Sequence, residues 1–167
     1  MWAIPQDLNK QFENSTDRAA AIVGGAYVEE CLLRALGGHL HKDKKRFDRL
    51  FHHSGSLSSF EAKIHIAVLV GLINDEFAND LKVIKDIRNG FAHDLKLDSF
   101  EADMVRDHLA KLTLVTLNRD IFKHVEKRDP TAREIFQGVV GEAGGMLSER
   151  RSTAMPDPPT YRSPRLR

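Results

Sequence analysis

The sequence predicts an all-α protein: a single compact helical bundle of about five to six helices with a disordered C-terminal tail. Apolar residues recur at helical spacing along most of the chain, and no stretch alternates apolar and polar residues between hairpin turns. The 167 residues are enough for one domain with a substantial core. We therefore expect an all-helical domain over residues 1–144 and a flexible, Arg- and Pro-rich tail over residues 145–167.

The first long helix is expected over residues 17–37. The Ser15-Thr16 pair can cap its start, and Asp17 suits its first turn because the N-terminal end of a helix attracts negative charge. The Gly37-Gly38 pair should end it. The Gly24-Gly25 pair follows no predicted strand and is not a phosphate-binding loop. We interpret it as a place where another helix approaches closely.

A basic stretch follows over residues 39–59, with a short helix suggested by Phe47, Leu50 and Phe51. Its cations are Lys42, Lys44, Lys45, Arg46 and Arg49. These side chains could contact phosphates, but the stretch lacks the repeated aromatic residues on which bases would stack. A solvated charged loop is therefore the default interpretation.

Two more helices are expected in the central part of the chain. One starts at Ser58 or Ser59 and runs to about Ile73, and its second half is apolar on nearly every side. That pattern predicts the central, most buried helix, and it makes His65 a core histidine. Asn74 should cap the next helix, whose inward stripe is Phe77, Leu81, Ile84, Ile87 and Phe91.

The last helices are predicted from their start signals. Glu101 lies three residues after Asp98, as in a capping box, which predicts a long helix that runs towards Phe122. Pro130 suits the first position of a final short helix that ends at about Val140. Beyond it, glycines, four prolines and arginines leave too little apolar surface to offset the entropy of ordering.

Composition excludes several functional classes. The net charge of +1 combines a tail of +3, counted from Glu149, with a body of −2, so the body is not a basic nucleic-acid-binding domain of the usual kind. Cys31 is the only cysteine, so an intrachain disulfide is ruled out. Cys31 is most simply a small core residue. No signal peptide, membrane span or metal-ligand motif is evident. We expect a cytoplasmic protein without a cofactor or metal.

The most informative segment runs from Ile87 to Asp94 and contains Arg88, Asn89 and His93. In the structural interpretation these residues form a clasp at a helix end, because polar groups near a core are rarely left without partners. Asn89 and His93 would tie the helix end to the next loop. Arg88 would pair with a carboxylate, for which the candidates are Asp17, Glu29, Glu30 and Asp86.

The alternative interpretation of this segment is metal-independent RNA cleavage. A histidine would move a proton and an arginine would stabilise the charged transition state at one phosphate. Arg88 and His93 are five positions apart, which is about 140° around an ideal helix at ~100° per residue. A joint site therefore requires the helix to end or distort near Gly90, or requires a second subunit.

Three stretches together resemble the MltR family, the mannitol operon repressor and its relatives. They are residues 17–30, residues 57–73 with the run Ser-Phe-Glu-Ala-Lys-Ile, and residues 84–93. The resemblance implies an all-helical, non-enzymatic transcriptional regulator without an ordinary DNA-binding motif, and no helix-turn-helix is evident in the sequence. It implies a protein partner in transcriptional control and allows a homodimer. The residues expected in its motifs and clasp are Asp17, Arg18, Glu30, Lys63, Arg88, Asn89, Phe91 and His93.

The pattern Arg-Asn-x-x-x-His also resembles the signature of HEPN domains, all-helical modules that include toxin ribonucleases. That resemblance implies Arg88 and His93 as a catalytic pair, with Asn89 as the polar residue after the arginine. It is the alternative function, and direct contact with DNA or RNA stays open under both interpretations.

Overall fold

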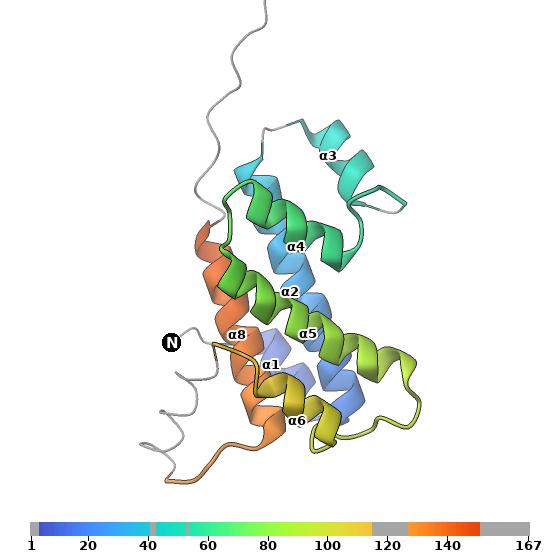
Figure 1. The fold of residues 1–167 in the computed structure, drawn as a ribbon, viewed down its shortest axis with the longest axis vertical. Helices are drawn as coiled ribbons and strands as arrows, with labels where there is room; N and C mark the ends of the chain where they lie inside the picture. Colours follow the sequence, from blue (N-terminus) through green and yellow to red (C-terminus); the bar gives the residue numbers. More distant parts are fainter. Residues whose placement is uncertain (1–3, 41–42, 53, 115–126, 151–167) are drawn as a thin grey trace, which may run out of the picture.

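The computed structural model describes residues 4–40, 43–52, 54–114 and 127–150. These residues form helices without any strand, which confirms the all-α fold class (Figure 1). The described helices, labelled as in Figure 1, are α1 (Gln6–Glu13), α2 (Asp17–His39), α3 (Lys44–Phe51), α4 (Phe60–Leu69), α5 (Asp75–His93), α6 (Asp103–Leu109) and α8 (Ala132–Arg150). Within the described ranges, no helix is both long and apolar enough to cross a bilayer.

The centre of the bundle is α2, which packs against α1, α4, α5 and α8 (Figure 1). The prediction that the helix after Ser59 is the central one is therefore wrong. At ten residues α4 is too short to contact as many neighbours as the 23 residues of α2. Its apolar outer side is also partly uncovered: Leu69 is 79% exposed, and His65 lies at the surface beside Glu61.

Several predicted helix starts are confirmed at atomic detail. The side chains of Thr16, Ser59 and Asn74 each accept a hydrogen bond from the backbone amide three residues later, at 3.2, 3.1 and 3.0 Å. The inward stripe of α5 is also confirmed, since its five predicted members are all buried. The helix ends are less well predicted. α2 continues through the Gly37-Gly38 pair to His39, and α4 ends before Gly71, whose φ of +70° provides the turn.

The predicted helix from residue 99 towards Phe122 does not form as one element. The segment before it makes a turn, in which the Ser99 hydroxyl accepts a hydrogen bond from the amide of Glu101, and α6 ends at Leu109. Residues 115–126 lie outside the described residues. Glu101 instead turns its carboxylate towards the start of α8. The predicted capping box therefore does not form: α6 begins at Asp103 without a side-chain cap, and Glu101 serves as a tertiary acceptor instead.

The final helix is longer than predicted. It runs to Arg150 rather than to about Val140. The reason is Leu147, which is fully buried, together with Met146, which packs against the core. Two apolar side chains at the correct helical phase outweigh the polar average of this stretch. Of the expected tail over residues 145–167, residues 151–167 lie outside the described residues.

Glycines allow close contact between α2 and its neighbours, as the Gly24-Gly25 pair predicted. A Cβ atom on Gly24 would lie 2.8 Å from Cε1 of Phe136 in α8, and one on Gly25 would lie 2.6 Å from Cβ of Arg88 in α5. On the other side of the same contact, a Cβ on Gly144 would lie 2.4 Å from Cε1 of Tyr27. Side chains therefore occupy the space that a larger residue would need.

The substitution Gly144→Ala is expected to destabilise the protein by about 1–3 kcal/mol, because the new methyl group overlaps the Tyr27 ring. The matched control is Gly145→Ala on the same helix, where the position is only half-buried. Alanine favours the helical conformation over glycine by about 1 kcal/mol at either position, so the control variant should have neutral or increased stability. Urea unfolding of the two variants measures the difference, and equal effects would contradict close packing at Gly144.

Candidate functional site

The Ile87–Asp94 segment belongs to a regular helix. α5 passes through Gly90 without interruption to His93, and the amide of Asp94 donates to the carbonyl of Gly90 at 2.9 Å. Arg88 is half-buried on the side facing α2, whereas His93 is exposed and makes no hydrogen bond or ion pair with the described residues. A distortion at Gly90 therefore does not bring the two together. One chain alone does not form an Arg–His site, so only a second subunit could complete it.

Arg88 pairs with two neighbours in the structure. Its Nη1 donates to Oδ1 of Asn89 at 2.8 Å, and its Nη2 lies 3.9 Å from Oε2 of Glu29 on α2. The Arg88 side chain is 32% exposed, and its aliphatic stem lies over Gly25. The other carboxylates considered for Arg88 have different partners: Asp17 pairs with Arg133, Asp86 with Lys85, and Glu30 with Arg34 at the surface.

Lys63 enters the same polar group from α4. Its side chain is 6% exposed, and its Nζ donates to Oε1 of Glu29 and to the carbonyl of Ser58, both at 2.6 Å. We call Glu29, Lys63, Arg88 and Asn89 the Glu29 cluster. One carboxylate on α2 thus holds a lysine from α4 and an arginine from α5, so three helices meet in it. Lys63 comes directly before the apolar run that begins at Ile64, and a charge in that place was the sequence signal that pointed to a buried partner.

The variant Arg88→Ala is expected to lose about 1 kcal/mol of stability, because the ion pair is long and the group is partly exposed to water. Some of that loss comes from the stem over Gly25, so Arg88→Met should retain more stability than Arg88→Ala. Urea unfolding at neutral pH measures both variants. A loss of about 3–5 kcal/mol would instead indicate an essential buried charge.

Arg18 closes the C-terminal end of α5 from the first turn of α2. Its Nη1 donates to the carbonyl of Phe91, and its Nη2 lies within hydrogen-bond distance of the carbonyls of Asp94 at 3.0 Å, Leu95 at 3.2 Å and Leu97 at 2.6 Å. Helix C-termini leave carbonyl groups without partners, and their partial negative charge favours a cation. The helix end is therefore held by Arg18, rather than by Asn89 and His93 as the structural interpretation supposed.

Asp17 forms a second junction beside Arg18. Its Oδ2 accepts from the amide of Phe100 at 2.9 Å, and its Oδ1 accepts from Nη1 of Arg133 at 2.7 Å. Arg133 also donates to the carbonyls of Phe12 and Ser15, at 2.6 and 2.9 Å. Sequence reasoning missed Arg133. A cation in the first turn of a helix is electrostatically unfavourable there, and this placement was the available sign of a tertiary partner.

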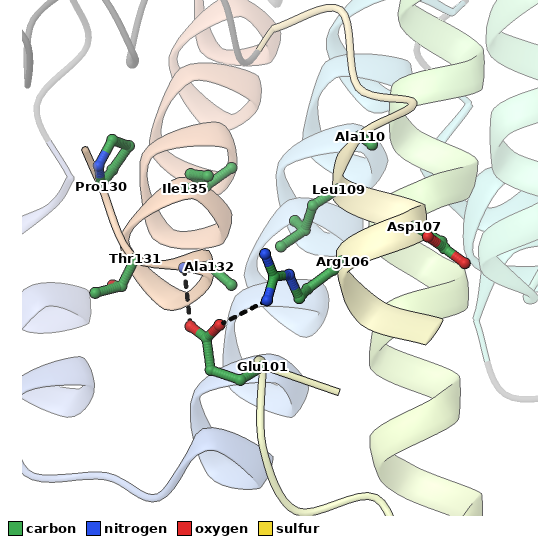
Figure 2. Close-up of a pocket in the computed structure, with 9 residues that line it drawn as sticks. All are labelled: Glu101, Arg106, Asp107, Leu109, Ala110, Pro130, Thr131, Ala132 and Ile135. Carbon is green, nitrogen blue, oxygen red and sulfur yellow. Dashed lines mark hydrogen bonds and ion pairs between the residues drawn. The ribbon is translucent and has the colours of Figure 1, made fainter. Parts of the chain in front are cut away.

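A cleft of about 360 Å³ lies between α6 and the start of α8, lined partly by Glu101, Arg106 and Ile135 (Figure 2). Figure 2 shows the Glu101 carboxylate between the amide of Ala132, at 3.3 Å, and the Arg106 guanidinium, at 3.8 Å. The helix start therefore already holds a carboxylate of the same chain. That occupancy makes the cleft a poor site for an external anion.

A capping box completes this helix start. The amide of Thr131 donates to Oε2 of Glu134 at 2.8 Å, and the amide of Glu134 donates to Oγ1 of Thr131 at 3.2 Å. Both terminal nitrogens of Arg128 also donate to the Glu134 carboxylate, at 2.9 and 2.6 Å. The Arg128 hydrogen bonds lower the pKa of Glu134 to about 2, so this carboxylate stays ionised near neutral pH.

Two other predicted features have simple places in the fold. Cys31 is buried on α2, and burial raises the pKa of its thiol, which makes it a core residue rather than a reactive nucleophile. Across the described ranges, no three His, Cys, Asp or Glu side chains are grouped so that they could hold a metal ion.

Comparison with known proteins places the fold. No family model matches the sequence, and no curated protein matches it. Two solved structures are similar in fold. MtlR from Escherichia coli, solved in a complex with HPr, has a TM-score of 0.65 at 16% identity and covers 84% of this chain and 95% of its own. YggD from Shigella flexneri, a possible transcriptional regulator, has a TM-score of 0.68 at 10% identity. That match covers 89% of this chain and 98% of the YggD chain. The chain therefore shares its fold with MtlR and YggD over most of its length.

Proposed function

We propose that this protein is a non-enzymatic transcriptional regulator of the mannitol-repressor type, which acts in the cytoplasm through a protein partner. The observation that carries the proposal is the fold similarity, which extends over 84% of this chain to MtlR, a protein solved together with HPr. A second regulator-like structure shares the fold over 89% of the chain. The sequence identities to these two proteins are 16% and 10%, so the protein partner is itself part of the proposal.

The site geometry also supports a non-catalytic role. Arg88 is already bonded to Asn89 and lies beside Glu29, while His93, the last residue of the same regular helix, is exposed. A general acid or base and a charge-stabilising group must both reach one phosphate, and the ideal angle of about 140° between these positions separates them. The polar motif residues instead connect helices, as the Glu29 cluster and Arg18 show.

The partner proposal is tested by titrating ¹⁵N-labelled full-length protein with purified HPr from Escherichia coli. We expect saturable chemical-shift changes confined to one surface, and isothermal titration calorimetry should give the same stoichiometry. Unrelated small proteins of similar size and charge serve as the control. An absence of saturable changes at millimolar HPr would overturn an HPr-type partner.

The catalytic alternative is tested with structured RNA. Wild-type protein and His93→Ala should leave the RNA equally intact, because one chain does not bring His93 to Arg88. Cleavage by the wild type that His93→Ala and Arg88→Ala both abolish would overturn the non-enzymatic proposal. In that case the dependence of the rate on the square of protein concentration would reveal a site shared between two subunits.

A further inference from the structure

α3 is a short basic helix whose two phenylalanines pack against the bundle. Phe47 and Phe51 stack with ring centroids 4.4 Å apart, Phe51 is buried, and Phe47 lies against Gly37 of α2. The following loop is fixed to the helix, since the amide of Leu57 donates to the carbonyl of Leu50 at 2.9 Å. Figure 1 shows α3 at the opposite end of the molecule from α6. The short helix expected within the basic stretch is therefore confirmed, and it is anchored to the bundle rather than part of a solvated loop.

The anchoring phenylalanines turn the cations outwards. At ~100° per residue, Lys45 and Arg49 lie on the face opposite the phenylalanines. Lys44, Lys45 and Arg49 are exposed, and none forms an ion pair or a side-chain hydrogen bond with the described residues. The two acidic residues of the segment are occupied: Asp43 caps the helix and pairs with Arg46, and Asp48 lies 3.5 Å from His52.

The charge of α3 contrasts with that of the rest of the bundle. Residues 43–52 carry four Lys and Arg residues against two Asp and Glu residues. The other described residues carry 14 Lys and Arg against 19 Asp and Glu. An anionic partner would therefore be attracted to α3 and repelled by the body, which both selects and orients the contact.

We propose that α3 binds the phosphate backbone of duplex DNA, with Lys44, Lys45 and Arg49 as the contacting residues. Cations on one exposed helix suit closely spaced phosphates and give affinity without base recognition. A membrane surface fits less well, because a helix lying on lipid needs a broad free apolar face, whereas Phe47 and Phe51 of α3 are packed and Leu50 is its one exposed apolar side chain. The contact would hold a regulator near DNA while a protein partner sets its target, and it does not depend on that partner.

The test uses the full chain and a fluorescein-labelled duplex of about 24 base pairs with mixed sequence. The triple variant Lys44→Ala/Lys45→Ala/Arg49→Ala is compared with a charge-matched control, Lys10→Ala/Lys96→Ala/Lys111→Ala, which removes three exposed lysines elsewhere. Fluorescence anisotropy at 20–200 mM salt gives affinity and its salt dependence. Residues 151–167 are present in every sample, so their arginines contribute equally. Circular dichroism checks that each variant is folded.

We expect wild type and control to bind at low salt, and the α3 variant to bind about tenfold or more weakly. Its plot of log affinity against log salt should be flatter by about 2–3 units of slope, since each phosphate contact contributes about 0.9. Equal binding by the α3 variant, an equal loss in the control, or no binding by wild type at 20 mM salt would overturn the proposal. So would binding to anionic phospholipid vesicles without binding to DNA. The same variant should bind HPr as the wild type does, so that failure of either proposal is seen separately.

Discussion

Replacing Lys63 by methionine should lower the free energy of unfolding by about 3–5 kcal/mol, because it leaves a carboxylate in a mostly buried place without its ammonium partner. The Glu29 side chain is 21% exposed, and after the change only the distant Arg88 guanidinium, at 3.9 Å, would offset its charge. The carbonyl of Ser58 would also lose its donor at the start of α4. Methionine keeps the length of the side chain, so the loss reports charge rather than volume.

The control for Lys63 is a double-mutant cycle with Glu29→Leu. Each single variant leaves one buried group without its partner, whereas the double variant removes both charges together. Replacement of a buried ion pair by apolar residues is often close to neutral. The double variant should therefore be more stable than Lys63→Met alone, as measured by urea unfolding with an unchanged m-value. Additive losses would show that the two side chains are not energetically coupled.

Arg18→Ala should have the second-largest effect, a loss of about 2–4 kcal/mol, because hydrogen bonds to charged groups contribute more than neutral ones. The carbonyls of Phe91 and Leu97 are the main acceptors, since both bonds are partly buried and water replaces them poorly. Amide hydrogen exchange should speed up in residues 91–97 before it does elsewhere, because this is the loop that Arg18 holds.

Two further variants isolate the role of the guanidinium. Arg18→Lys should recover only part of the lost stability, since an ammonium group cannot reproduce the planar, forked donors of arginine. Arg34→Ala removes an arginine from the same helix, where it forms an exposed pair with Glu30, and should cost less than about 0.5 kcal/mol. An equally small effect at Arg18 would mean that solvent satisfies these carbonyls in its place.

Local sequence signals predicted what depends on local physics. The caps at Thr16, Ser59 and Asn74 use a side chain and an amide three residues apart, and the stripe of α5 repeats at a single helical period. These features need no knowledge of other helices. The all-α fold class and the close helix approach at Gly24 could likewise be predicted from local sequence patterns.

The errors came from features that depend on distant partners. The second half of α4 is apolar on nearly every side, but the length of the helix, and not its hydropathy, decides how many neighbours it contacts. Leu147 keeps α8 helical to Arg150 because it is buried in the core, and the composition around it gave no sign of that burial. At the candidate site, the spacing of Arg88 and His93 gave the correct separation. The partner of the helix end, Arg18, lies more than 70 positions away and could not be identified from spacing.

The contact between α2 and α8 has a consequence for the order of synthesis. Gly24 meets Phe136, which is made more than a hundred residues later, so the largest helix of the bundle lacks a main neighbour until α8 leaves the ribosome. Contacts that distant in the chain form late, because loop closure must precede them. A nascent chain that stops before Ala132 exposes the glycine face of α2, so the packing of this helix is completed only once α8 has been made.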